Sequence, residues 1–294
     1  MKNTEIMPIE TSLSVREKRK PDLKPADILI RVLGLLFARA VLLPGMAPLG
    51  LSFLTLDRKF SAKSLINLLF VSVGYILMFD FDTAIRYIPA CIIFELVLFV
   101  MEHKTEVSLY FVSIAAGAVL LVCESAALFW TGFTGAEFVL ELCDIMIMIA
   151  GIVVVDRGGE LLRGGRVLNR PLVSDEKISV CIMLGIMLIG TKTLTVLEVF
   201  SIANTLAFIA VAAAAISGGL TAGAVCGVCT GALIGLGGDF AAATAMYSIC
   251  GLICGAAAYF MPGRRAAVGI SLAAAGAISV LFTGIDIGVF HMPN

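Results

Sequence analysis

Long apolar runs separated by short polar segments make up most of the sequence. The first run, residues 28–56, is interrupted by prolines. The later runs lie at about 65–79, 87–101, 107–130, 138–155, 178–190, 195–217, 219–236, 240–260 and 266–283. A straight helix needs about 20 apolar residues to cross a bilayer core about 30 Å thick. We therefore predict an all-α, polytopic membrane bundle with about ten spans, some of them short, tilted or kinked.

Two prolines break the first apolar run. Pro44 and Pro48 remove backbone donors, so a continuous helix over residues 28–56 is not expected. The sequence leaves two alternatives open for this run, one kinked span or two half-helices.

Composition agrees with a membrane protein. Of the 294 residues, 60% are apolar and only 15% are charged, which lies outside the range of ordinary soluble domains. The basic residues gather in the N-terminal tail, between Arg157 and Lys177, and at Arg264–Arg265. Because they form no basic stripe, we expect the lipid bilayer as a partner and no nucleic acid.

The basic clusters also predict topology, because Lys and Arg favour the cytoplasmic side. All three clusters can be cytoplasmic if the proline-broken run counts as two crossings. We expect a charged cytoplasmic tail over 1–27 without a removable signal peptide, a membrane domain over 28–288 and a short tail over 289–294. On this count the chain lies in the cell membrane as a multi-pass protein, with its N-terminus inside and its C-terminus outside.

Glycines recur every four residues in one of the later runs. They are Gly219, Gly223, Gly227, Gly231 and Gly235, followed by Gly251 and Gly255 in the next run. Residues four apart share a helix face, so each helix presents a strip of bare backbone. In lipid such strips permit close helix packing. We expect the 219–236 helix to cross a neighbour tightly, with 240–260 as the preferred partner; whether that partner belongs to the same chain or to a second copy stays open.

Four cysteines lie in the same two runs, at Cys226, Cys229, Cys250 and Cys254. Their spacing is compatible with metal or redox chemistry. Zinc thiolates need a polar second shell, however, and the neighbours here are Ala, Gly, Val and Ile. We therefore interpret the cysteines as packing residues and expect no metal and no cofactor.

A few polar side chains interrupt the apolar runs, at a cost of about 2.5–3.5 kcal/mol each at the bilayer centre unless they are paired. The ionisable ones are Arg31, Arg39, Glu95, Glu124, Glu141, Asp144 and Glu198. Arg31 and Glu141 can snorkel or lie near a helix end. The candidates that remain are Arg39, Glu95, Glu124, Glu198 and Asn204. We favour a structural ion pair between Arg39 and one of the glutamates, and a transport or proton pathway is the alternative. Since no nucleophile and base share a motif, we expect no catalysis in this chain.

Two segments resemble a known family. They are residues 35–40 (LLFARA) with 47–50 (APLG), and above all residues 216–237 (ISGGLTAGAVCGVCTGALIGLG). These segments are similar to the membrane region of stage II sporulation protein E of endospore-forming Firmicutes, and the similarity extends over about residues 28–288.

This resemblance implies a membrane-anchoring and self-association module. Full-length family members also carry a region that engages a tubulin-like division protein and a PPM-type serine/threonine phosphatase, which acts at the asymmetric septum to activate the first forespore sigma factor. The present sequence lacks both parts and one closing apolar helix, so the resemblance implies a truncated or split membrane module. Division or sporulation proteins are then the expected partners. A small-solute transporter or substrate-capturing subunit is the alternative, motivated by the proline-broken run and the buried carboxylates.

Overall fold

The described part of the chain is helical almost throughout. The computed structural model describes residues 25–42, 45–58, 60–78, 81–102, 108–131, 135–164, 174–196, 200–236, 240–261, 263 and 265–283. The helices are α1 (Pro25–Ala38), α2 (Leu49–Leu54), α3 (Ala62–Met78), α4 (Phe81–Glu102), α5 (Leu109–Thr131), α6 (Gly135–Gly164), α7 (Ser174–Gly190), α8 (Ile202–Gly235), α9 (Phe240–Phe260) and α10 (Arg265–Thr283). Two short antiparallel strands, β1 (Thr195–Val196) and β2 (Phe200–Ser201), join α7 to α8.

Among the described residues, five helices are long and apolar enough to cross a membrane. They are α4, α5, α6, α9 and α8, the last counted over its full 34 residues although the bend at Gly219 divides it into two shorter arms. Shorter apolar stretches lie in α1, α3 and α10. The expected count of about ten spans is therefore not confirmed, because several of the predicted runs form helices shorter than a straight crossing needs.

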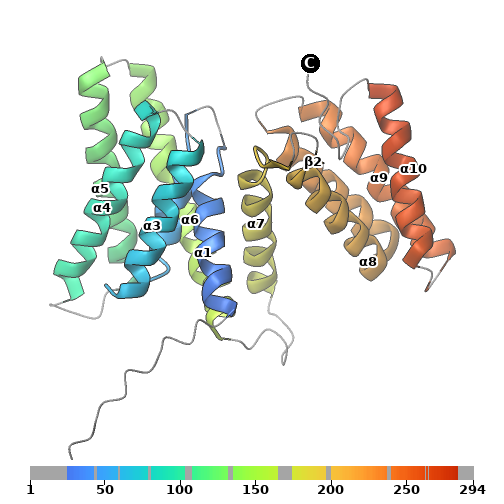
Figure 1. Ribbon diagram of the computed structural model, residues 1–294, viewed down its shortest axis with the longest axis horizontal. Coiled ribbons are helices and arrows are strands. Elements are labelled where there is room, and N and C mark those ends of the chain that lie inside the picture. The colour runs from blue at the N-terminus through green and yellow to red at the C-terminus, as the bar shows by residue number, and fades with distance from the viewer. Residues whose placement is uncertain are drawn as a thin grey trace, which may run out of the picture.

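The proline-broken run forms two helices that fold back on each other (Figure 1). A methyl group built on Gly34 of α1 would lie 2.8 Å from the Phe53 ring of α2, and the rings of Phe37 and Phe53 are 5.3 Å apart. Between the helices, the Leu42 N–H donates to the Met46 carbonyl. Of the two alternatives left open by the sequence, the structure has two separate helices.

Gly219 divides α8 into two arms, a first arm over 202–218 and a second over 220–235. Its φ of +67° and ψ of −149° are not helical. The Ala215 Cβ lies 3.1 Å from where a Gly223 Cβ would stand, whereas eight residues of continuous helix rise about 12 Å. The chain therefore reverses at Gly219, and the predicted runs 195–217 and 219–236 correspond to antiparallel arms.

Helix directions alternate, so the connections fall on two sides of the molecule (Figure 1). On one side lie the start of α1, the α2–α3 connection, the Gly219 bend and the start of α10; we name this the α1-start side. Contacts along the helices fix these directions. Gly74 of α3 packs on the Leu35 carbonyl of α1, and the Cys254 thiol of α9 faces the Val268 carbonyl of α10.

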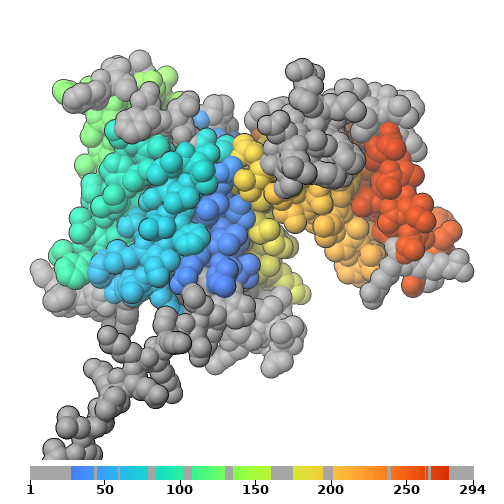
Figure 2. All heavy atoms as spheres, viewed as in Figure 1, coloured from blue at the N-terminus to red at the C-terminus, as the bar shows by residue number. Residues whose placement is uncertain are grey.

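Helix α7 joins the two halves of the molecule, and Figure 2 shows it between α1 and α8. Gly190 of α7 lies directly against the Leu36 carbonyl of α1. On the other side of α7, a methyl group on Gly185 would lie 2.9 Å from the Leu233 side chain of α8. Leu188 belongs to the same buried cluster as Ala203.

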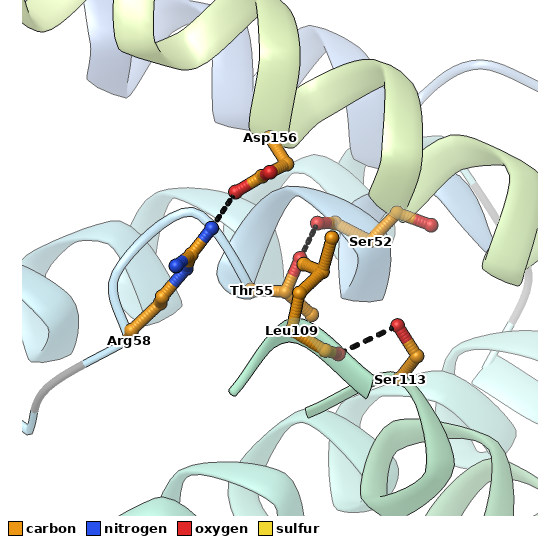
Figure 3. A network of polar contacts seen from close by, with 6 residues as sticks. All are labelled: Ser52, Thr55, Arg58, Leu109, Ser113 and Asp156. Atoms are coloured by element: carbon orange, nitrogen blue, oxygen red, sulfur yellow. Dashed lines mark hydrogen bonds and ion pairs between the residues drawn. The ribbon is translucent and has the colours of Figure 1, made fainter. Parts of the chain in front are cut away.

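Polar contacts connect α2 and the turn that follows it to α6, and Figure 3 shows one of them, the ion pair of Arg58 with Asp156. The Ser52 hydroxyl donates to the Met148 carbonyl at 2.9 Å, and Thr55 donates to the Ser52 carbonyl at 2.6 Å. Arg58 forms an ion pair with Asp156 near the α1-start side. These contacts satisfy polar groups of a short helix that would otherwise be costly in an apolar interior.

Candidate functional site

The glycine repeat of α8 lies against the backbone of α9. A methyl group on Gly223 would lie 2.7 Å from the Gly251 carbonyl oxygen, and one on Gly231 would lie 2.7 Å from the Thr244 Cα. Gly227 packs directly on the Tyr247 carbonyl, between these two contacts. We name this contact of the second arm of α8 with α9 the glycine seam. Its members on α8 are Gly223, Gly227, Gly231 and Gly235, and those on α9 are Gly251 and Gly255.

The seam joins two helices of the same chain. Along the seam the residue numbers rise in α8 as they fall in α9, since Gly235 contacts Phe240 and Gly255 contacts Leu220. Helices α8 and α9 therefore form an antiparallel hairpin with backbone contact along its length. The sequence leaves open whether the partner of the 219–236 helix lies in the same chain or in a second copy. In the structure this partner is α9 of the same chain.

Gly219 differs from the other glycines of the repeat. No atom lies within 4 Å of the place where its Cβ would stand. Its backbone instead adopts a positive φ that side chains of L residues rarely permit. The sequence predicts a packing residue at this position, and the structure makes it the bend between the two arms.

Asn204 lies on the first arm of α8 and reaches the same hairpin. The Tyr247 hydroxyl donates to the Asn204 Oδ1 at 3.2 Å, and the Ser201 hydroxyl caps α8 by accepting the Asn204 N–H. The Tyr247 ring also packs against Phe208 at 5.1 Å between centroids. Through its hydrogen bond with Tyr247, Asn204 thus connects the first arm of α8 to α9.

The cysteines of α8 and α9 do not gather into one site. Cys250 and Cys254 are buried, whereas Cys226 is partly buried and Cys229 is exposed. The Cys254 thiol faces α10. Within the described part of the chain, no group of three or more His, Cys, Asp or Glu side chains is placed to hold a metal ion.

Arg39 follows α1 at the side opposite the α1-start side. It is only 5% exposed, its Nη2 donates to the Thr193 hydroxyl at 2.7 Å, and its Nε has no hydrogen-bond partner. Among the described residues it pairs with neither Glu95 nor Glu124, so the predicted ion pair with these glutamates is wrong. Glu198 lies outside the described residues.

Lys192 lies in the same turn as Thr193. Its amine donates to the Leu236 carbonyl at the end of α8, at 2.7 Å. Loss of solvation lowers the pKa of the Lys192 amine below its ordinary value. This contact attaches the turn after α7 to the end of the hairpin.

Glu95 on α4 is buried beside the start of α3. The Ser64 hydroxyl donates to its Oε2 at 2.5 Å, while its Oε1 has no hydrogen-bond partner. Close by, the Asn67 amide donates to Asp57 at 2.6 Å. Glu95 is thus held by a serine hydroxyl.

Glu124 on α5 lies beside Asp144 on α6, and the two carboxyl groups are within hydrogen-bond reach. The Tyr87 hydroxyl donates to the Asp144 Oδ2 at 2.6 Å and accepts the Ala47 N–H at 3.1 Å. The Tyr75 hydroxyl donates to the Ala47 carbonyl at 2.8 Å. The segment between α1 and α2 is therefore anchored by two tyrosines next to a carboxyl pair.

Sequence reasoning missed part of this arrangement. Tyr75 and Tyr87 are absent from the predicted set, although a tyrosine hydroxyl in an apolar run is a signal that a polar partner lies nearby. Asp144 is recognised as an ionisable residue of the apolar runs but is not among the selected candidates. Glu141 lies in the second turn of α6, which begins at Gly135, and its side chain is only 6% exposed.

Residues 8–291 match the family described as SpoIIE, N-terminal domain. The chain belongs to this family. The match runs from before α1 to beyond α10, so the glycine seam and the buried polar groups both lie inside the SpoIIE N-terminal domain. The resemblance seen in residues 216–237 is confirmed. No curated protein and no solved structure matches the chain.

The match identifies a membrane module of the SpoIIE type. Only the N-terminal domain of SpoIIE is found in this sequence, and no catalytic phosphatase domain is found. The apolar helices α4, α5, α6, α8 and α9 fit a membrane protein by length and composition. The features described in this SpoIIE domain are close helix packing and buried polar contacts.

Proposed function

We propose that this chain is the membrane-anchoring and self-association module of a SpoIIE-type protein and carries no catalysis of its own. Its role is to concentrate a phosphatase at the asymmetric septum, where the first forespore sigma factor is activated. The observation that carries this proposal is the match to the SpoIIE N-terminal domain over almost the whole helical region. Division or sporulation proteins are the partners that such a module would recruit.

The glycine seam supplies the rigid part of the module. Apolar side chains gain little by leaving lipid for another helix, so docking in a membrane depends on close backbone packing. Gly223, Gly227 and Gly231 permit that approach between α8 and α9. The glycine face of α8 is covered by α9 of the same chain, so self-association uses other helix faces. The hairpin of α8 and α9 holds those other faces in position.

The distribution of basic residues supports a cytoplasmic N-terminus. Arg58, Lys63 and Lys177 lie at helix ends on the α1-start side, and α10 begins there with Arg265. Basic residues near span ends favour the cytoplasmic side. With α1 starting in the cytoplasm and alternating helix directions, α10 ends on the outer side.

Localisation in sporulating cells of an endospore former tests the proposal. The full chain, fused to a fluorescent protein, is expected to accumulate at the asymmetric septum. A variant with Gly223, Gly227 and Gly231 changed to Leu is expected to lose this enrichment at unchanged membrane content. Gly269→Leu on α10 is the matched control, because open space surrounds Gly269. Uniform distribution of the wild-type fusion over the membrane would contradict the proposal.

A small-solute transporter is the second candidate. The observation that favours it is the break between α1 and α2, which lies beside Tyr87 and Asp144, since broken helices frame binding sites in transporters. Uptake into vesicles containing the purified chain separates the two functions. Flux that depends on Glu95 or Glu124, measured with the Gln variants, would favour the transporter, and absence of flux would favour the anchor.

A further inference from the structure

Two acidic side chains from neighbouring helices meet in the interior of the helical domain. Glu124 of α5 is 4% exposed, and Asp144 of α6 is 2% exposed. Their carboxyl groups are within hydrogen-bond reach of each other. Glu124 Oε2 and Asp144 Oδ1 are buried, and among the described residues neither accepts a hydrogen bond from an N–H or O–H group. Two unneutralised charges so close together in an apolar interior would be very costly.

Other titratable groups surround the pair on every packed element. Only one of them is a cation. They are Tyr75 on α3; Arg86, Tyr87 and Cys91 on α4; Cys123 on α5; and Glu141 on α6. A single guanidinium cannot balance three carboxylates, so at least part of the remaining charge must be neutralised by a bound ligand.

The hydrogen-bond pattern identifies that ligand. Ionised carboxylates only accept hydrogen bonds, so two carboxyl groups in hydrogen-bond contact must hold a proton between them. We infer that Glu124 and Asp144 form a proton-binding site inside the membrane domain, with the proton carried by Glu124 and donated to Asp144.

The contacts of Asp144 decide which group carries the proton. The single hydroxyl proton of Tyr87 points to Asp144, because that contact is 2.6 Å whereas the contact with the Gly45 carbonyl is 3.2 Å. Asp144 thus accepts from Tyr87 and from Glu124, as the ionised member of the pair should. Since Tyr87 also accepts the Ala47 N–H, two hydrogen bonds through Tyr87 link the proton site to the segment between α1 and α2.

Infrared spectroscopy of the full chain in lipid nanodiscs tests this inference. A protonated carboxyl group gives a C=O band, distinct from the bands of carboxylates, that shifts in D₂O. At neutral pH the wild type is expected to show such absorption, and Glu124→Gln should remove the component that Glu124 contributes, while a component from the buried carboxyl groups of Glu95 and Glu141 stays. Asp144→Asn should keep the band but shift it, because Glu124 then donates to a neutral amide. Asp175→Asn, at an exposed position in the first turn of α7, is the control and should leave the band unchanged.

Several results would overturn the inference. The inference fails if the wild type shows no C=O band of a protonated carboxyl group, or if Glu124→Gln leaves this band unchanged. It also fails if Asp144→Asn loses the band. Loss of the band on addition of NaCl or CaCl₂ at constant pH would show that a metal cation takes the place of the proton. If Glu124→Gln does not fold, peptide mass spectrometry of wild-type chain treated with dicyclohexylcarbodiimide, which adds to protonated carboxyl groups in apolar surroundings, replaces it. An adduct at Glu124 supports the inference, and its absence there overturns it.

Discussion

A methyl group added in the middle of the glycine seam should weaken the hairpin. In Gly231→Ala the new Cβ would stand 2.7 Å from the Thr244 Cα, 2.8 Å from the Ala243 oxygen and 3.1 Å from the Tyr247 Cβ. Two of these three atoms belong to the backbone of α9, so no side-chain rotation relieves the overlap. Ordinary van der Waals contact begins at 3.4 Å, and α8 and α9 must therefore separate locally by about 0.7 Å (3.4 − 2.7).

The magnitude follows from that separation. A radial gap of about 0.5–1 Å removes a quarter to a half of the dispersion energy of each contact that it opens, and overpacking of this kind costs about 1–3 kcal/mol. Alanine is also a better helix former than glycine by up to about 1 kcal/mol, which masks part of the loss. Gly269→Ala on α10 makes the same chemical change in open space. The difference in unfolding free energy between the two variants therefore measures the effect of the added methyl group on the contacts of the seam.

The free energy of unfolding of the full chain in mixed micelles, titrated with SDS and followed by circular dichroism, measures this difference. Gly231→Ala is expected to be about 1–3 kcal/mol less stable than Gly269→Ala. Equal stabilities within about 0.5 kcal/mol would refute the claim that backbone contact along the seam holds α8 to α9.

Two further substitutions test other parts of the fold in the same titration. Tyr87→Phe leaves the Ala47 N–H without its acceptor and removes one of the donors to Asp144, so it should cost about 1–3 kcal/mol. Tyr75→Phe removes one donor only and should cost less. Equal losses of unfolding free energy in Tyr87→Phe and Tyr75→Phe would argue against the hydrogen bonds of Tyr87 with Ala47 and Asp144. Gly219→Ala puts a side chain where φ is +67° and ψ is −149°, which should cost about 1–3 kcal/mol through backbone strain, and an unchanged stability would contradict the bend.

Local periodicity was enough to predict some features of the fold. A four-residue repeat keeps one helix face, and Gly223, Gly227, Gly231 and Gly235 do lie on one face, against α9. Prolines remove backbone donors, and the run containing Pro44 and Pro48 is indeed divided into α1 and α2. In both cases the cause is a property of the residues themselves.

Features that depend on tertiary contacts could not be predicted in this way. Tyr87 meets Asp144 across 57 positions of sequence, and Arg39 meets Thr193 across 154. No local pattern specifies such pairs. The bend at Gly219 also depends on context, because the same residue type four positions later is helical and packs against α9.

The number of chains per particle tests the proposed assembly module most directly. The full chain is extracted from membranes in native nanodiscs, and its copies are counted by stepwise photobleaching of a single fluorescent label. Wild-type particles are predicted to contain more than one copy, and particles of the chain with Leu at positions 223, 227 and 231 should contain one. Single-copy wild-type particles, or undiminished assembly of the Leu variant, would contradict the account.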